Sequence, residues 1–124
     1  MTQARLRTGR VGEDVACELL ERHGAGIVAR NSRTRAGEID VVALDCGTLV
    51  FVEVKTMRTG ARSGPERPAL AVGPRKQLQV RRLARAWLAE NRPPRYDSIR
   101  FDVIGVSLDP GDSPVTIERI TDAF

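Results

Sequence analysis

The sequence predicts an α/β domain in which helices flank a β-sheet. Two segments carry apolar residues at helical spacing, and five shorter segments are rich in valine and isoleucine. Turn residues separate them in the order helix, three strands, helix, two strands, an order typical of a sheet covered by helices. A chain of 124 residues buries one core, so we expect a single domain over residues 1–124.

The helices follow from apolar periodicity and from their stop signals. Apolar residues line one face of Val11–His23, and Gly24 follows as a natural end. The polar, arginine-rich residues 1–10 are expected to form a flexible N-terminus. A second amphipathic helix is predicted over Pro74–Glu90, before a segment that contains two prolines.

The strands are predicted from short apolar runs. Gly37–Leu44 and Leu49–Lys55 flank the turn Asp45–Thr48 and so indicate a hairpin. Residues 56–73 hold Gly, Pro, Ser and Arg without periodicity, which predicts a mobile loop near a ligand. The remaining strands are expected at Ile27–Ala29, Ile99–Val106 and Val115–Arg119.

Composition narrows the possible functions. Twenty Lys and Arg against sixteen Asp and Glu give a net charge of +4, which favours a polyanionic partner. His23 is the only histidine, which excludes a Ser-His-Asp or Cys-His centre. Cys17 and Cys46 form no zinc-binding pattern, so a reduced, cytoplasmic protein is expected. No apolar run reaches about 18 residues, so we expect no membrane partner.

The hairpin gathers the residues with the clearest chemistry. If its turn is symmetric, Asp40 lies opposite Glu53, Glu38 lies opposite Lys55, and all four share one face. Opposed carboxylates about 5 Å apart repel each other, so a counter-charge is needed, either Lys55 or a divalent cation. The alternative is a solvated polar face on which Glu38 and Lys55 form a surface ion pair.

Both helices place polar residues beside their apolar faces. Glu13 falls beside Leu20 and so leans toward the packing partner of the first helix, although the helix dipole alone also favours an acid there. Lys76 and Gln77 flank the apolar stripe where the second helix starts. Lys55 and Lys76 are the only lysines, and a lysine has a pKa that its surroundings can shift.

Arginines recur in the segments predicted as loops and tails. They suit a phosphate-binding rim, and the alternative is an ordinary solvated surface. Aromatic residues make up only 4% of the chain, so backbone recognition of duplex or branched nucleic acid is favoured over base stacking. The groups are Arg5, Arg7 and Arg10; Arg30, Arg33 and Arg35; and Arg58, Arg62 and Arg67.

Several motifs together resemble a known family. They are Gly12-Glu13 with Ala16, Arg30-Asn31, Gly37-Glu38-Ile39-Asp40, Phe51-Val52-Glu53-Val54-Lys55, Lys76 at a helix start, and Arg100-Phe101-Asp102-Val103. From about Gly9 to Val106 the chain resembles the YraN-like bacterial proteins, which are similar to archaeal Holliday-junction resolvases. The resemblance implies a restriction-endonuclease-like mixed sheet of about five strands flanked by helices, although Ile39 stands where the PD-(D/E)XK motif has proline.

The resemblance also implies a metal-dependent nuclease that acts on branched or structured DNA. Asp40 and Glu53 would hold Mg²⁺ or Mn²⁺, with the Val54 carbonyl as a further ligand, and Lys55 would position or activate the attacking water. Glu13 would complete the acidic cluster and Gln77 would orient the substrate.

Nucleic acid is the expected partner, DNA ahead of RNA, and the expected contacts are Arg30, Arg33, Arg35, Arg58 and Lys76. An RNA-cutting enzyme and a binding module with little or no catalysis stay open as alternatives. The sequence also leaves a homodimer open.

Overall fold

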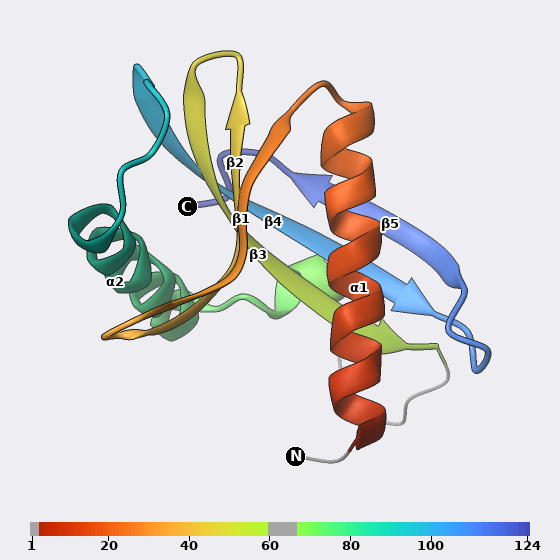
Figure 1. Ribbon diagram of the computed structural model, residues 1–124. Coiled ribbons are helices and arrows are strands. Elements are labelled where there is room, and N and C mark those ends of the chain that lie inside the picture. The colour runs from red at the N-terminus through yellow and green to blue at the C-terminus, as the bar shows by residue number, and fades with distance from the viewer. Residues whose placement is uncertain (1–2, 60–66) are drawn as a thin grey trace.

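A single mixed sheet of five strands forms the centre of the protein, with one α-helix on each face (Figure 1). The computed structural model describes residues 3–59 and 67–124. The α/β class predicted from sequence is therefore confirmed. The elements are α1 (Gln3–Arg22), β1 (Gly26–Thr34), β2 (Gly37–Asp45), β3 (Thr48–Arg58), the 3₁₀ helix η1 (Pro68–Ala71), α2 (Pro74–Glu90), β4 (Ser98–Leu108) and β5 (Pro114–Ile120).

The strands lie in chain order across the sheet. β1, β2 and β3 form an antiparallel meander, and β5 pairs with β4 in the antiparallel sense. β3 and β4 run parallel over their whole length, from Thr48 beside Ser98 to Arg58 beside Leu108. Parallel neighbours need a long crossover connection, and here the segment that contains η1 and α2 supplies it.

Each face of the sheet buries its own apolar cluster. On one face, Ala16 and Leu20 of α1 pack on alternating residues of the central strands, such as Val50 and Val52. On the other face, Leu83 and Trp87 of α2 pack on Leu49 and Phe51, and the rings of Phe51 and Trp87 meet edge to face at 5.8 Å. A sheet covered on both faces explains why β3 reads as a nearly continuous apolar run.

The close approach of α1 to β3 depends on Gly12. A Cβ atom placed on Gly12 would lie 1.8 Å from the hydroxyl oxygen of Thr56, so only glycine fits there without a rearrangement. In the same way, a Cβ on Gly105 would lie 2.5 Å from the backbone nitrogen of Ala69. The absence of a side chain at Gly105 therefore lets η1 lie directly on β4. These two contacts fix how closely the covering elements lie on the sheet.

The helix predicted from Val11 in fact begins at Gln3, so the prediction of a flexible segment was wrong for residues 3–10. This stretch contains no proline and several good helix formers. It is also tied down by tertiary contacts, because Arg7 pairs with Asp112 at 3.2 Å and the Thr8 hydroxyl accepts a hydrogen bond from Arg58.

The loop predicted over residues 56–73 was also partly wrong. Residues 56–58 continue β3, because the parallel partner β4 is long enough to pair with them, and Pro68–Ala71 forms η1. The rest of that prediction falls mainly on residues 60–66, outside the described residues. β1 runs to Thr34 and not to Ala29, since an edge strand accepts polar residues on its exposed side. Within the described segments, no helix is long and apolar enough to cross a membrane.

Candidate active site

The candidate site forms where strands β2 and β3 part. Their register follows the predicted symmetric turn, from Asp45 beside Thr48 to Val41 beside Val52. Among the described residues the ladder stops there and does not reach Asp40 and Glu53. Instead, the Asp40 carboxylate accepts a hydrogen bond from the Val54 backbone N–H at 2.9 Å. A side chain thus replaces a strand partner at the end of the ladder.

The parting of the strands corrects the prediction that four polar residues share one face. Ile39 and Val42 both belong to the cluster under α2, although residues three apart in a regular strand point to opposite faces. Glu38 is therefore not opposite Lys55 and instead lies beside Arg33 of β1. The alternation fails because β2 follows β1 alone once it has left β3.

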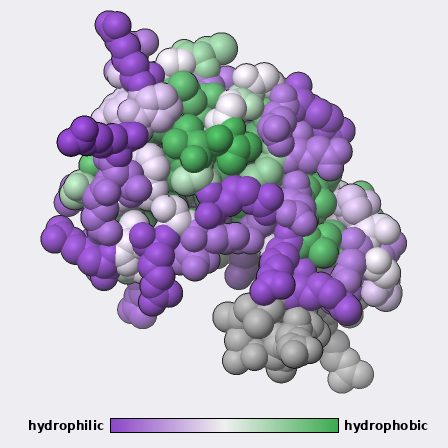
Figure 2. All heavy atoms as spheres, in the orientation of Figure 1, coloured by the Kyte–Doolittle hydropathy of each residue, from purple (hydrophilic) through white to green (hydrophobic). Residues whose placement is uncertain are grey.

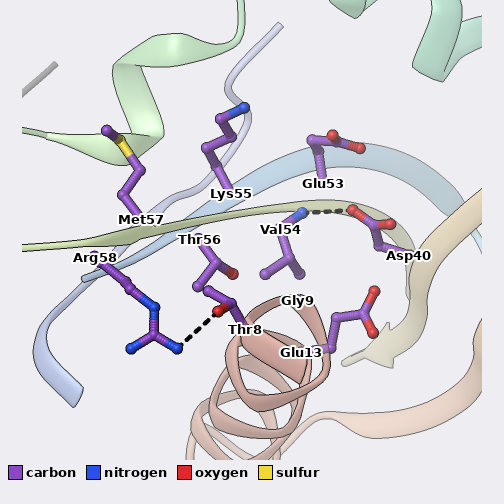
Figure 3. Close-up of a pocket in the computed structure, with 10 residues that line it drawn as sticks. All are labelled: Thr8, Gly9, Glu13, Asp40, Glu53, Val54, Lys55, Thr56, Met57 and Arg58. Carbon is purple, nitrogen blue, oxygen red and sulfur yellow. Dashed lines mark hydrogen bonds between the residues drawn. The ribbon is translucent and has the colours of Figure 1, made fainter. Parts of the chain in front are cut away.

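The parted strands and the start of α1 enclose a pocket of 790 Å³ (Figure 3). The carboxylate of Glu13 points toward that of Asp40, while Glu53 and Lys55 rise from the opposite side of β3 to Val54. The lining residues are Thr8, Gly9, Glu13, Asp40, Glu53, Val54, Lys55, Thr56, Met57 and Arg58. The pocket thus brings together six residues that the sequence singles out: Glu13, Asp40, Glu53, Val54, Lys55 and Arg58.

The carboxylates of the pocket hold too much negative charge for the cations beside them. Burial, followed by the negative charge of Asp40, raises the pKa of Glu53 to about 7. Burial also raises the pKa of Asp40, against the opposing effect of its hydrogen bond from Val54. The pKa of Glu13 is raised as well, mainly by burial. All three acids of the pocket therefore have pKa values above their ordinary ones.

The lysine that neutralises part of this charge is Lys76, not Lys55. The Lys76 ammonium lies 3.3 Å from a carboxylate oxygen of Glu53, whose side chain is only 12% exposed. Lys55 lines the pocket but is exposed, and it forms no ion pair within the described part of the chain. Of the two counter-charges that the sequence left open, Lys55 and a divalent cation, Lys55 does not pair with Glu53, because α2 brings a nearer cation from another part of the chain.

Other predicted site residues lie away from the pocket lining. The Gln77 side-chain amide donates a hydrogen bond to the Val72 carbonyl at 3.1 Å, at the start of α2. The Arg30 guanidinium donates a hydrogen bond to Asp14 of α1 at 2.6 Å, so its charge is already paired with a carboxylate. Arg33 lies at the exposed end of β1, and Arg35 follows in the turn to β2.

Arg58 does reach the pocket, but its guanidinium is already engaged. It donates to the Thr8 hydroxyl at 3.0 Å and lies 2.5 Å from Asp112, in the turn between β4 and β5. The predicted arginine rim is therefore divided between engaged and free side chains. Arg62 and the side chain of Arg5 lie outside the described residues.

The sequence motifs gave no role to Asn31, although it hydrogen-bonds to Glu13 and lowers the pKa of that acid against the effect of burial. Its backbone φ of 47° lies in the left-handed region, which asparagine adopts more readily than most residues. Asn31 therefore holds Glu13 from the side of β1. The available signal was its place next to Arg30 in the Arg30-Asn31 motif.

The donor atoms of the pocket suit a divalent cation. Asp40 and Glu53 offer hard carboxylate oxygens within hydrogen-bonding reach of each other, an arrangement that a cation or a shared proton stabilises. No cluster of three or more Asp, Glu, His or Cys side chains in the described segments could hold a metal. A cation here would therefore complete its coordination with water and phosphate oxygens, as Mg²⁺ commonly does.

Comparison with other sequences identifies the family. A model of the uncharacterised protein family UPF0102 matches residues 12–106. The chain is 47% identical to a UPF0102 protein of Streptomyces griseus, over 91% of this chain and 92% of that protein. It is 45% identical to one of Syntrophus aciditrophicus, over 100% and 92%, and 50% identical to one of Frankia casuarinae, over 94% of each. In agreement with the YraN-like resemblance, the chain belongs to the uncharacterised protein family UPF0102.

Proposed function

We propose that this protein is a nuclease that uses Mg²⁺ or Mn²⁺ to hydrolyse phosphodiester bonds in branched or structured DNA. One observation supports this proposal above all others. Asp40 and Glu53 meet where two strands part, both with raised pKa values, and among the described residues Lys76 is the one cation that pairs with Glu53. A pocket with excess buried carboxylate attracts a dication, and a dication in turn attracts a phosphate group.

Five residues of the pocket have roles in this proposal. Asp40 and Glu53 hold the cation, and the Val54 carbonyl is a further ligand at the same edge. Lys55, which lines the pocket and is free of ion pairs among the described residues, stabilises the charge that develops on the phosphate. Glu13 completes the acidic cluster, and Asn31 orients Glu13. Gln77 stays a predicted substrate-orienting residue.

A bound divalent cation would supply two effects in such a site, a lower pKa for a coordinated water and polarisation of a phosphoryl oxygen. The protein contributes the geometry. Because the Val54 N–H fixes one oxygen of Asp40, that carboxylate is already oriented before any ligand arrives. The neighbouring Glu53 side chain is only 12% exposed.

A second candidate function is a nucleic-acid- or partner-binding module with little or no catalysis. The contacts of the carboxylates favour it, because Asp40 is bonded to Val54 and Glu53 is paired with Lys76. In this view the acids serve only to secure the parted strands. Location in the cytoplasm and a homodimer are further expectations that both candidates share.

The two candidates separate in a cleavage assay. Branched, nicked and linear DNA, with matched RNA, should be incubated with the protein in Mg²⁺, Mn²⁺ or EDTA. We expect metal-dependent cleavage of branched DNA, and its loss in Asp40→Asn, which removes a ligand charge but little volume. The variant should keep its fold and its DNA affinity. Equal cleavage by Asp40→Asn and the wild type would contradict the assignment, and binding without any cleavage would favour the binding module.

A further inference from the structure

Helix α2 is strongly and asymmetrically charged. It carries one acidic residue, Glu90 at its end, against five basic ones, namely Arg75, Lys76, Arg81, Arg82 and Arg85. Arg81 and Arg85 are four residues apart, a spacing at which like charges destabilise a helix. By contrast, Glu18 and Glu21 are exposed on α1, across the sheet. Helix α1 as a whole carries four basic and four acidic residues, so α2 is the more basic of the two helices.

The arginines divide into those with protein partners and those without. Arg30, Arg67, Arg100 and Arg119 are all paired with carboxylates, and Arg81 stacks over the ring of Phe101 at 4.8 Å. Arg75, Arg82 and Arg85 are exposed, and they form no hydrogen bond or ion pair within the described segments. Unpaired arginines on a helix with almost no acids are available to an external anion.

Two of these free arginines line a groove. It has a volume of 370 Å³ and is bordered by Ala36, Arg75, Leu78, Gln79 and Arg82. The four helical residues lie at the spacing of one helix face, here called the α2 face. Leu78, 62% exposed, is the apolar residue that helix α2 contributes to it. Figure 2 shows hydrophilic side chains projecting on the side of the molecule where α2 lies, at the left.

The α2 face adjoins the candidate active site. Arg75 is the neighbour of Lys76, whose ammonium reaches Glu53. From Arg75 to Arg82 the helix rises roughly 10 Å, about the length that three phosphates occupy along one strand of a duplex. A strand that continues from the pocket along this face therefore has phosphates of the same backbone near both Arg75 and Arg82.

We infer that the α2 face, formed by Arg75, Leu78, Gln79 and Arg82, binds the sugar-phosphate backbone of nucleic acid on its way to the pocket. This inference rests on the proposed function for the identity of the strand. Arginine forks match phosphate oxygens, Gln79 offers a further donor, and Leu78 provides apolar contact for a sugar. An acidic protein is the weaker match, because one exposed leucine is a small apolar centre for a protein interface.

The test measures binding without cleavage. Labelled duplex and branched DNA are titrated with wild type and Arg75→Gln/Arg82→Gln in EDTA, over a series of salt concentrations. Loss of two phosphate contacts should reduce the slope of log affinity against log salt by about 1.8. The matched control is Arg22→Gln/Arg95→Gln, which removes the same two charges from the net +4 at exposed positions off this face. Circular dichroism verifies that both variants stay folded.

The outcomes separate the inference from the proposed function. A slope reduced in the α2-face variant but not in the control supports the inference, whether or not the wild type cleaves DNA. Equal losses in the two variants, or no DNA binding by the wild type, would overturn it. So would displacement of the DNA by poly-L-glutamate as efficiently as by unlabelled duplex, which would indicate an acidic protein partner. Cleavage that survives in the α2-face variant with unchanged affinity would refute the inference and leave the proposed nuclease intact.

Discussion

Two buried carboxylate sites lie on neighbouring strands and behave in opposite ways. Asp102 of β4 stands beside Val52 of β3, next to Glu53. It is fully buried, yet Arg100 and Arg119 both donate to it, at 2.8 Å and 3.0 Å, and so does the backbone N–H of Asp122.

Burial alone would raise the pKa of Asp102, but these hydrogen bonds bring it below its ordinary value. At Glu53 burial prevails, because a single lysine faces more than one acid. The number of cations, and not the degree of burial, thus distinguishes the two sites. A carboxylate with enough partners secures the fold, and one with too few is available for a ligand.

The largest effect is expected from Asp102→Asn. It removes the buried counter-charge of Arg100 and of Arg119, whose side chain is only 9% exposed, and leaves them the partly exposed Asp45 at 3.3 Å and 3.4 Å. Breaking such a pair from one side costs about 3–5 kcal/mol of unfolding free energy. Urea denaturation measures the loss, and the exposed Glu21→Gln serves as control with an expected change within about 0.5 kcal/mol. A loss below about 1 kcal/mol would mean that the cluster contributes little to stability.

A smaller effect is expected from metal ions, and it concerns only the under-neutralised site. Mg²⁺ or Mn²⁺ at a hundred times its dissociation constant should stabilise the folded protein by about 2.7 kcal/mol, seen as a higher melting temperature. Glu53→Gln should lose most of this response, because it removes a ligand and the mutual repulsion with Asp40. If millimolar Mn²⁺ leaves the wild-type melting curve unchanged both with and without bound DNA, the metal centre is refuted.

The smallest expected effect is a pH dependence of opposite sign at the two sites. Because the folded pKa of Glu53 is raised from 4.5 to about 7, its contribution to stability is full below pH 4.5 and is lost as pH rises through 7. We expect the metal-free wild type to lose stability across this range relative to Glu53→Gln. Asp102 has a lowered pKa, so its contribution is present above pH 3.8 and is lost as the pH falls further. Denaturant titrations from pH 3 to pH 8 measure both, and parallel curves for wild type and Glu53→Gln would contradict the sign at Glu53.

Local signals explain which parts of the fold were predictable. The bounds of α2, Pro74–Glu90, match the sequence prediction because a proline, an apolar period and a terminating segment lie within one stretch. The hairpin register was also predictable, since Cys46 and Gly47 both have positive φ, as a tight symmetric turn requires.

The length of β3 could not be predicted, because it depends on a parallel partner about fifty residues away in the chain. The same limit applied to the candidate site. The sequence placed Asp40 and Glu53 together, because a short turn joins their strands. It could not identify Lys76 as the partner of Glu53, since that contact depends on how α2 returns over the sheet. Nor could it predict that the Asp40 side chain would accept the Val54 N–H, because that requires the strands to part.

The close contact between Gly12 and Thr56 controls the width of the pocket. The hydrogen atom that serves as the side chain of Gly12 sets the separation between α1 and β3, and Glu13 is the next residue on that helix. A methyl group added at Gly12 would push α1 away from β3 and so move the Glu13 carboxylate away from Asp40. The distance between Glu13 and Asp40 thus depends in part on the missing side chain of Gly12, a residue that has no charged or reactive group of its own.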